Sequence, residues 1–125
     1  MEETTDNALK PIILKTPLGF DYFAYNEIIM FKAEHNNTLV FTTVKDTPVR
    51  ALCNLNFIEK NYCNKFFFRC HKSHIINLIH IEKLIIKTRQ VQMKKDLMVT
   101  ISKCCLKKLK EMSAGQKDKS YIQIL

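Results

Sequence analysis

Residues 66 to 78, with the sequence FFFRCHKSHIINL, hold the densest group of side chains that could bind or react with a ligand. The segment joins an aromatic anchor, a basic cluster and an aliphatic pair, namely Phe67, Arg69, His71, Lys72, Ile75 and Ile76. We expect Phe67 to anchor the segment in a core while the basic side chains stand out of it. Ser73 is a candidate cap for a short helix that begins at Ile75.

These residue types do not make a catalytic site. Cys70 and His71 are adjacent, and adjacent side chains of a strand point to opposite faces, so they cannot form a thiolate–imidazole pair. Carboxylates are scarce around them, and the two glycines of the chain rule out a glycine-rich phosphate loop. We therefore expect neither an enzyme nor a bound cofactor.

Cys63, Cys70, His71 and His74 lie close enough in sequence to suggest a zinc site. Structural zinc sites use paired thiolates about two to four residues apart, and the chain has no such pair. Its five cysteines are an odd number in a chain without an export signal, which argues against disulfides. We expect no metal and interpret the cysteines as small apolar core residues.

The composition indicates one soluble domain. A length of 125 residues and a hydrophobic fraction of 46% suffice for a single core and argue against disorder. No apolar run approaches the roughly 20 residues that a membrane span needs. The start, MEETTDNALK, is acidic and polar where a secretory signal is basic and then apolar. We expect a cytoplasmic protein without membrane contact.

The net charge of +8 is unevenly distributed along the chain. Residues 1–58 hold five Lys and Arg against seven Asp and Glu, a charge of −2, whereas residues 59–125 hold fifteen against five, a charge of +10. In a compact domain this asymmetry gives one strongly positive face, which is typical of a protein that binds a polyanion. A lysine-rich surface that serves only solubility explains the charge equally well.

Short extended segments joined by turns dominate the first two thirds of the chain. Predicted strands cover residues 12–15, 20–25, 27–34, 38–45 and 49–52, and a three-stranded meander covers residues 81–102. Gly19 marks one turn, and the asparagines at 36 and 37 tolerate the positive φ that a tight hairpin requires. Hairpin connections of this kind predict largely antiparallel sheets.

A short helix is predicted between the strands and residue 66. Leu55, Ile58 and Tyr62 fall on one face of this helix, and either Asn54 or Asn56 can cap it. The spacing therefore predicts an internal helix that covers the core with one side.

A second helix is predicted to begin after its cap, Ser102, and to end at Met112. Its two faces carry Cys105, Leu106, Leu109 and Met112 on one side and Lys103, Lys107, Lys108 and Lys110 on the other. We expect a domain over residues 12–112, preceded by a flexible arm at 1–11 and followed by a tail at 113–125. The YIQIL end of that tail either pairs as an edge strand or is disordered.

The basic half of the chain can bind nucleic acid. Lysines such as Lys107 and Lys108 can contact phosphates, which positions the protein and makes affinity fall with salt. Lys72 can donate to guanine acceptors, and Asn36 or Asn37 can pair with adenine. Most aromatic residues are embedded in apolar runs, which gives less support to stacking on single strands.

The segment at 66–78 also resembles a known signature. Its matching residues are Phe67, Arg69, His71, Lys72, Ser73, Ile75, Ile76 and Asn77. They resemble the F-x-R-x-H-[RK]-S-x-[ILV]-[VI]-N signature of the LytTR family of bacterial DNA-binding domains. Val99, Ile101, Ser102 and Lys103 are similar to the family's closing [IV]-P-V-S-R element, although Thr100 replaces its proline. Cys104 and Cys105 stand where basic or aromatic residues are common.

The resemblance extends from Ile12 to Met112 and implies an elongated all-β, mainly antiparallel fold of several small sheets, with one short internal helix and a C-terminal helix. It implies that loops contact DNA in place of a recognition helix. By this analogy the DNA-facing residues are Asn36, Asn37, Thr38, Lys72, Ser73, Lys103 and Cys104, to which we add Lys107 and Lys108 as phosphate contacts. Residues expected to build and support the signature turn are Phe67, Arg69, His71, Ile75, Ile76 and Asn77.

The resemblance implies a sequence-specific regulator of transcription that binds double-stranded DNA. The family usually supplies the output domain of response regulators in two-component systems, whose partners are a receiver domain and a sensor kinase. The residues before Ile12 are too few for a receiver, so we expect either a free-standing protein or an excised output domain. Two protomers on repeated half-sites would fit this function. A basic RNA-binding or ribosome-associated module and a protein-interaction domain remain the alternatives.

Overall fold

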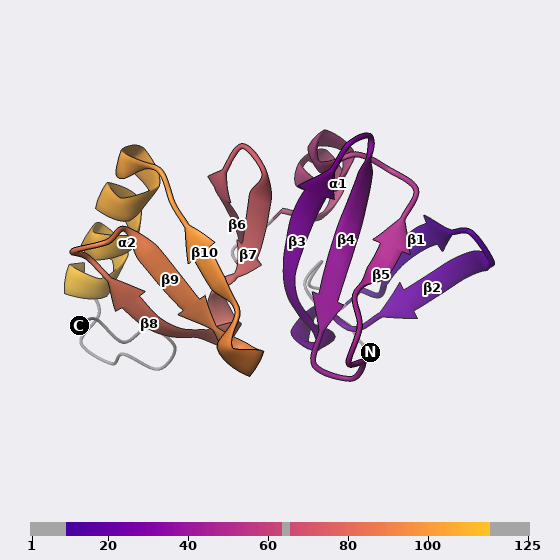
Figure 1. Ribbon diagram of the computed structural model, residues 1–125, viewed down its shortest axis with the longest axis horizontal. Helices are drawn as coiled ribbons and strands as arrows, with labels where there is room; N and C mark the ends of the chain where they lie inside the picture. The colour runs from indigo at the N-terminus through magenta and orange to yellow at the C-terminus, as the bar shows by residue number, and fades with distance from the viewer. Residues whose placement is uncertain (1–9, 64–65, 116–125) are drawn as a thin grey trace, which may run out of the picture.

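The computed structural model describes residues 10–63 and 66–115, and within them the chain forms an elongated stack of antiparallel sheets (Figure 1). A two-stranded sheet forms one end, a five-stranded sheet lies in the middle, and a three-stranded sheet with the C-terminal helix forms the other end. This arrangement confirms the predicted all-β, mainly antiparallel class with several small sheets and two helices.

The two-stranded sheet is the hairpin of β1 (Ile12–Thr16) and β2 (Gly19–Phe23). Gly19 has a φ of 147°, a conformation that strains any residue with a Cβ, and it follows the two-residue turn as predicted. Side chains alternate along both strands, so Ile12, Leu14 and Phe23 face the core. Their neighbours face outward and leave one side of the hairpin uncovered.

The five-stranded sheet has the order β5-β4-β3-β7-β6. Its strands are β3 (Ile28–Glu34), β4 (Asn37–Thr42), β5 (Val49–Ala51), β6 (Phe67–His71) and β7 (His74–Asn77). The central strands β3 and β7 are buried on both faces, with Phe31 and Ile75 in one core and Met30 and Ile76 in the other. The sheet is therefore the wall between two hydrophobic cores.

The first core lies between this sheet, the β1–β2 hairpin and α1 (Leu55–Tyr62). Leu55 and Ile58 of α1 are buried, and the Tyr62 hydroxyl donates to the Ile13 carbonyl at 3.0 Å, as expected for the predicted core-facing side. Asn54 caps the helix by accepting the Phe57 N–H at 2.9 Å. Of the two predicted caps, Asn54 is thus the one used, and the Asn56 side chain has another partner.

The second core is covered by the three-stranded sheet and α2 (Lys103–Gly115). The predicted meander is confirmed as β8 (Ile81–Ile85), β9 (Gln90–Met93) and β10 (Met98–Thr100), paired in the order β10-β9-β8. Leu109 is buried and the other three predicted apolar residues of α2 pack around this core. The helix runs past Met112 to Gly115, and the YIQIL segment lies outside the described residues.

The expectation that Ser73 caps a helix beginning at Ile75 is wrong. Ile75 and Ile76 lie in strand β7, because pairing with both β3 and β6 lets each of them enter a different core. The capped turn comes later, at Leu78–His80, and its cap is Asn77, whose Oδ1 accepts the Ile79 N–H at 3.2 Å. Local cap propensity was outweighed by two-sided burial.

Asn77 joins the end of β7 to the start of β3. It is fully buried, and its side-chain amide donates to the carbonyls of Tyr25 and Ile28, both at 2.9 Å. All three hydrogen bonds of the side chain go to backbone groups, so the buried amide is fully used.

We predict that Asn77→Ala lowers the free energy of unfolding by about 2 to 3 kcal/mol, because it leaves buried carbonyls without donors. Equilibrium urea unfolding measures the loss. The control is Asn61→Ala, because Asn61 is exposed on α1 and donates to the Phe57 carbonyl of the same helix at 2.8 Å. The loss of stability in this control should stay below about 0.5 kcal/mol. Equal effects of the two substitutions would contradict the assigned role of Asn77.

Candidate nucleic-acid interface

Three connections that are far apart in sequence reach the same long edge of the molecule. The β3–β4 turn, the β6–β7 turn and the entry into α2 lie along the upper edge in Figure 1, in a row that follows the long axis. They are the three segments that the sequence analysis expected to face DNA.

The β3–β4 turn consists of His35 and Asn36, since Glu34 and Asn37 already pair across the strands. His35 has the positive φ, 57°, which the sequence analysis had assigned to the asparagines. His35 and Asn36 are exposed, so His35 is a tip residue that the sequence analysis missed. Two-residue hairpin loops need positive φ at one position, and only the strand register shows which residue takes it.

Asn37 and Thr38 lie deeper than predicted. Asn37 begins β4 and is partly buried, while Thr38 is fully buried and its hydroxyl donates to the Cys53 carbonyl at 2.8 Å. Thr38 therefore holds β4 against the loop before α1, and its side chain does not reach the surface.

The β6–β7 turn presents Lys72 and Ser73, and Arg69 braces it from below. The Arg69 guanidinium donates to the Lys72 carbonyl at 2.6 Å and to Glu59 Oε1 and Asn56 Oδ1 at 2.7 and 2.6 Å. The two side-chain acceptors belong to α1, so this single residue ties the turn to the helix. Charge-assisted bonds of this kind are among the stronger ones in proteins.

Further hydrogen bonds fix the same turn from the other side. His71 Nδ1 accepts the Ser73 N–H at 3.1 Å, and the Ser73 carbonyl accepts the Ala33 N–H at 2.8 Å. The second bond links the turn directly to β3, next to the β3–β4 hairpin. Arg69 and His71 thus both bond the backbone of the turn, and Lys72 is exposed at its tip.

The entry into α2 is attached to β6. Ser102 caps the helix as predicted, since its Oγ accepts the Cys105 N–H at 3.2 Å, and its own N–H donates to the Cys70 carbonyl at 3.2 Å. Cys105 Sγ donates to the Arg69 carbonyl at 3.4 Å. Lys103 and Cys104 are exposed at the first turn of the helix, and Lys107 and Lys108 are exposed one turn later.

Burial shifts the pKa values of several titratable groups in β6, in β7 and in the segment after β7. Burial lowers the pKa of His74 to about 4, and the nearby His71 and Lys32 act in the same direction. Burial also lowers the pKa of His80, whose Nε2 donates to the Asn26 carbonyl at 2.6 Å. Burial raises the pKa of the Cys70 thiol to about 12, with Cys105 adding to the effect, so Cys70 is no nucleophile at neutral pH.

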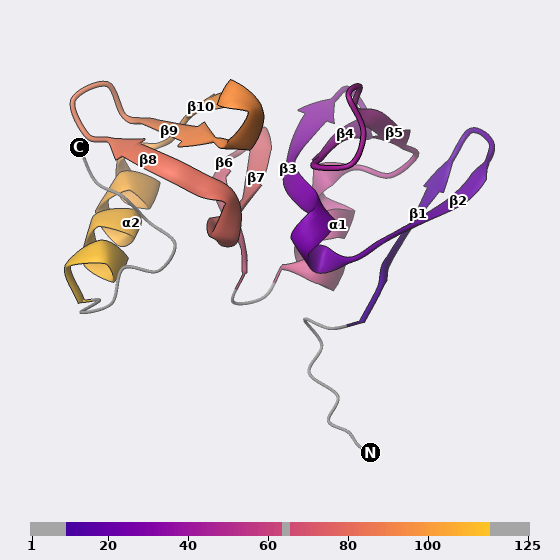
Figure 2. The ribbon, with the colours of Figure 1, turned by 90° about the horizontal axis from the view of Figure 1, so that it is seen from below.

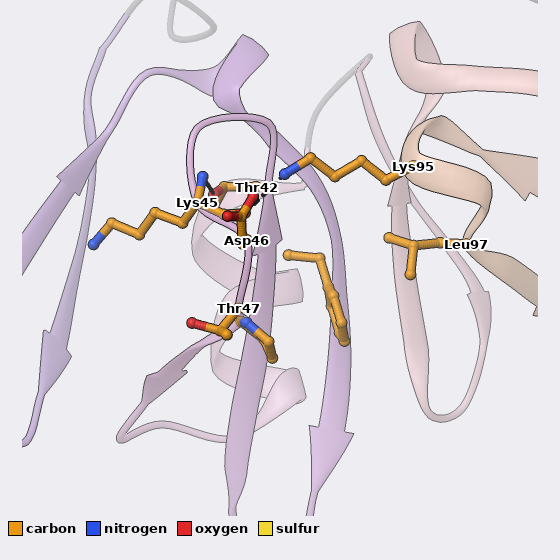
Figure 3. Close-up of a pocket in the computed structure, with 8 residues that line it drawn as sticks. Thr42, Lys45, Asp46, Thr47, Lys95 and Leu97 are labelled. Atoms are coloured by element: carbon orange, nitrogen blue, oxygen red, sulfur yellow. Dashed lines mark hydrogen bonds between the residues drawn. The ribbon is translucent and has the colours of Figure 1, made fainter.

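A small cavity of about 160 Å³ lies away from this edge, at the opposite ends of β4 and β10 (Figure 3). Phe41 and Leu97 contribute apolar walls, and Lys95 reaches across from the three-stranded sheet, its Nζ donating to the Lys45 carbonyl at 2.7 Å.

Within residues 10–63 and 66–115, no three metal-binding side chains are grouped around a common point. None of the helices in that part of the chain is long and apolar enough to cross a bilayer.

We predict that Arg69→Ala lowers the free energy of unfolding by about 2 kcal/mol, because its guanidinium makes several charge-assisted bonds at the base of a turn. The matched control is Arg50→Ala, which removes a salt bridge with Glu34 in which the Arg50 side chain is 45% exposed, against 21% for Arg69. The free energy of unfolding of Arg50→Ala should fall by less than about 0.5 kcal/mol. Chemical denaturation of both variants compares them, and similar losses would refute the bracing role.

We also predict that acid destabilises the protein through His74. Because its pKa is about 4 in the folded chain and 6.5 in the unfolded chain, the unfolded state binds more protons between these values. Stability therefore rises with pH across this window and is lost as pH falls below about 6.5. Melting temperatures measured from about pH 7 to about pH 5 should fall less steeply for His74→Gln than for the wild type, and least for His74→Gln with His80→Gln. Parallel pH profiles would contradict the assignment.

Known proteins share both this sequence pattern and this architecture. The sequence profile described as the LytTr DNA-binding domain matches residues 22–114. Among solved structures, the chain is similar to the LytTr DNA-binding domain of a putative methyl-accepting/DNA response regulator from Bacillus cereus, with 21% identity and a TM-score of 0.68 over 85% of this chain and 97% of that one. No curated protein sequence matches. With three-quarters of its length matched by the profile and the same fold, the chain belongs to the LytTR family of DNA-binding domains.

Proposed function

We propose that this chain binds double-stranded DNA sequence-specifically and regulates bacterial transcription. The observation that carries the proposal is the row of braced turns along one edge, each with exposed polar or basic side chains. Because the row follows the long axis, a duplex laid along it would meet the turns one after another. Loops would then enter successive segments of the major groove, and a bend in the duplex would bring all of them into contact.

The roles of the side chains follow from their positions. Lys72, at the tip of the best-supported turn, donates to guanine O6 and N7, and Asn36 pairs with adenine from the β3–β4 turn. Lys103, at the entry into α2, contacts the segment of the major groove that faces this third connection, and Cys104 lies beside it. Lys107, Lys108 and the Ser73 hydroxyl contact phosphates, which orient the protein without reading sequence. Asn37 supports the turn at its base, and Thr38 is left out because it is buried.

The bracing of the turns favours this function over a surface that is basic by chance. Reading bases requires donors held in a narrow range of positions. The backbone of the turn is fixed at Lys72 by Arg69, and at Ser73 by His71 and Ala33, through the bonds described above. A lysine that only improves solubility needs no such support. Because burial raises the pKa of the Cys70 thiol, no thiolate under the turn repels the phosphates at neutral pH.

In the cell, this domain is either the output domain of a two-component response regulator in the cytoplasm or a free-standing regulator. As an output domain it takes its signal from a receiver domain and a sensor kinase. The similar Bacillus cereus domain belongs to a protein described as a putative methyl-accepting/DNA response regulator, which supports the first arrangement.

Selection of bound duplexes from a random library tests the proposal. The selected duplex should bind at least about a thousandfold more tightly than random duplex at physiological salt. Single-stranded RNA serves as the comparison for the alternative module. If the selected pool gains nothing over random duplex, or if RNA binds better, the proposed function is lost.

We predict that Lys72→Ala and Lys108→Ala have different effects. Lys72→Ala should cost about 1 to 3 kcal/mol on the best site and relax the base preference at one position, because it removes a base contact. Lys108→Ala should weaken binding to all sequences alike and reduce the salt slope by about 1, because it removes a phosphate contact. Titrations of the selected duplex and of random duplex over a range of salt concentrations separate the two effects. If both variants lose equal affinity on all sequences, Lys72 does not read a base.

A further inference from the structure

The cavity at the edge opposite the turns, called the inter-sheet cavity below, is lined by both apolar and polar groups, as small-molecule sites are. One wall comes from the end of β4 and the β4–β5 loop, and the other comes from the connection between β9 and β10. Figure 2 shows this edge from below, with the β9–β10 connection facing the five-stranded sheet. Phe41 and Leu97 pack against the second core and remain partly exposed. The volume of about 160 Å³ accommodates a molecule of about the size of benzene.

The backbone that carries Lys95 to the cavity has an uncommon conformation. Lys95 and Asp96 are consecutive residues other than glycine, and their φ values are 63° and 59°. Such residues cost free energy, and they cluster where a ligand is held. The Asp96 carboxylate is bound on its own sheet by the Gln92 amide, which donates to it at 3.2 Å. Lys95 instead extends to the opposite wall, where its Nζ donates to the Lys45 carbonyl (Figure 3).

Two hydrogen-bond donors line the cavity beside its apolar walls. The Lys95 ammonium has three N–H groups and gives one of them to the Lys45 carbonyl, so the others can be donated to a ligand. The Thr42 hydroxyl accepts the Lys45 N–H at 3.1 Å, and its own proton can be donated as well. The polar groups of the cavity can therefore bind an acceptor.

The charges around the cavity favour an acceptor that is negatively charged. The charged residues of the lining are Lys45, Lys95 and Asp46, which together carry a net charge of +1. The Lys45 ammonium points away from Lys95 and lies 3.7 Å from the Asp21 carboxylate (Figure 3). Lys95 is thus the cation that a ligand in the cavity meets. A carboxylate forms strong charge-assisted hydrogen bonds with an ammonium, and an apolar group attached to it would cover the apolar walls.

We propose that the inter-sheet cavity binds a small organic anion, namely a carboxylate joined to an aromatic ring or to a branched aliphatic group of about six carbons. The carboxylate accepts hydrogen bonds from the Lys95 ammonium and the Thr42 hydroxyl, and the apolar group packs on Phe41 and Leu97. Ligands of this size bind weakly, with a Kd between about 10 µM and about 1 mM. The cavity includes none of the three turns along the long edge, so this inference does not rest on the proposed function.

A titration of the full chain with benzoate tests the proposal, because benzoate carries a carboxylate on a benzene ring. Amide chemical shifts are followed by NMR at constant ionic strength. Saturable changes are expected in the β4–β5 loop and in residues 94–97, with a Kd of about 1 mM or below. Benzamide has nearly the same shape without the charge, and it should bind at least about fivefold more weakly.

Substitutions distinguish the cavity from the rest of the basic surface. Lys95→Gln should lower the affinity for benzoate to that for benzamide, because it removes the ammonium from the cavity. The matched control is Lys94→Gln, which removes the same charge from an exposed lysine of the same turn that does not line the cavity. This control should change the affinity by less than about twofold, because exposed charges are screened by salt. Thr47→Phe, at an exposed residue of the lining, should fill the cavity and weaken the binding of both compounds.

Thermal unfolding gives a second measurement, since a ligand that binds only the folded state stabilises it. Benzoate should raise the melting temperature of the wild type and of Lys94→Gln, and it should leave that of Lys95→Gln unchanged.

Several results would overturn the inference. These are shifts that do not saturate up to about 20 mM benzoate, equal affinities for benzoate and benzamide, and equal losses of affinity in the two lysine variants. Shift changes confined to the three turns along the long edge would also overturn it, because benzoate would then occupy the surface proposed to contact phosphates.

Discussion

Strands β3 and β7 are buried on both faces, and the rest of the structure is built around this pair. Phe31 and Ile75 enter one core, and Met30 and Ile76 enter the other. A strand with core on both sides reads as a continuous apolar run, which is why residues 28–31 and 75–76 are all apolar. Because slipping by one residue would exchange the two faces, the register of β3 with β7 is strongly constrained. The constrained register therefore also fixes the positions of the turns at the ends of these strands.

The three turns along the long edge are coupled to one another by backbone hydrogen bonds. The Ala33 N–H to Ser73 bond joins the first turn to the second, and the Ser102 N–H to Cys70 bond joins the second to the third. Arg69 adds α1 to the same assembly. The conspicuous basic residues of the signature therefore divide into supports and a tip: Arg69 and His71 hold the turn, and Lys72 alone extends from it. A preorganised edge loses little entropy when it binds.

The molecule separates two kinds of surface in space. The long edge carries polar and basic turns suited to a polyanion, and the hairpin end carries exposed apolar side chains. Both are positioned by the same central sheet, one by its strand ends and the other by packing on its face.

The sequence by itself determined the local features. The spacing of Leu55, Ile58 and Tyr62, the cap at Ser102, the turn at Gly19 and the signature from Phe67 to Asn77 depend on neighbouring residues, and each predicted element is found. Local propensity did not predict the structure where residues far apart in the chain pair as strands. Ser73 is a turn residue and Thr38 is buried, because pairing between β3, β4 and β7 outweighs cap and loop preferences. Only the tertiary structure decided that His35 takes the positive φ, that Arg69 reaches α1, and that Phe20 and Tyr22 face outward at one end. Each of these depends on strand register and on the stacking of sheets, which contacts between residues far apart in the chain determine.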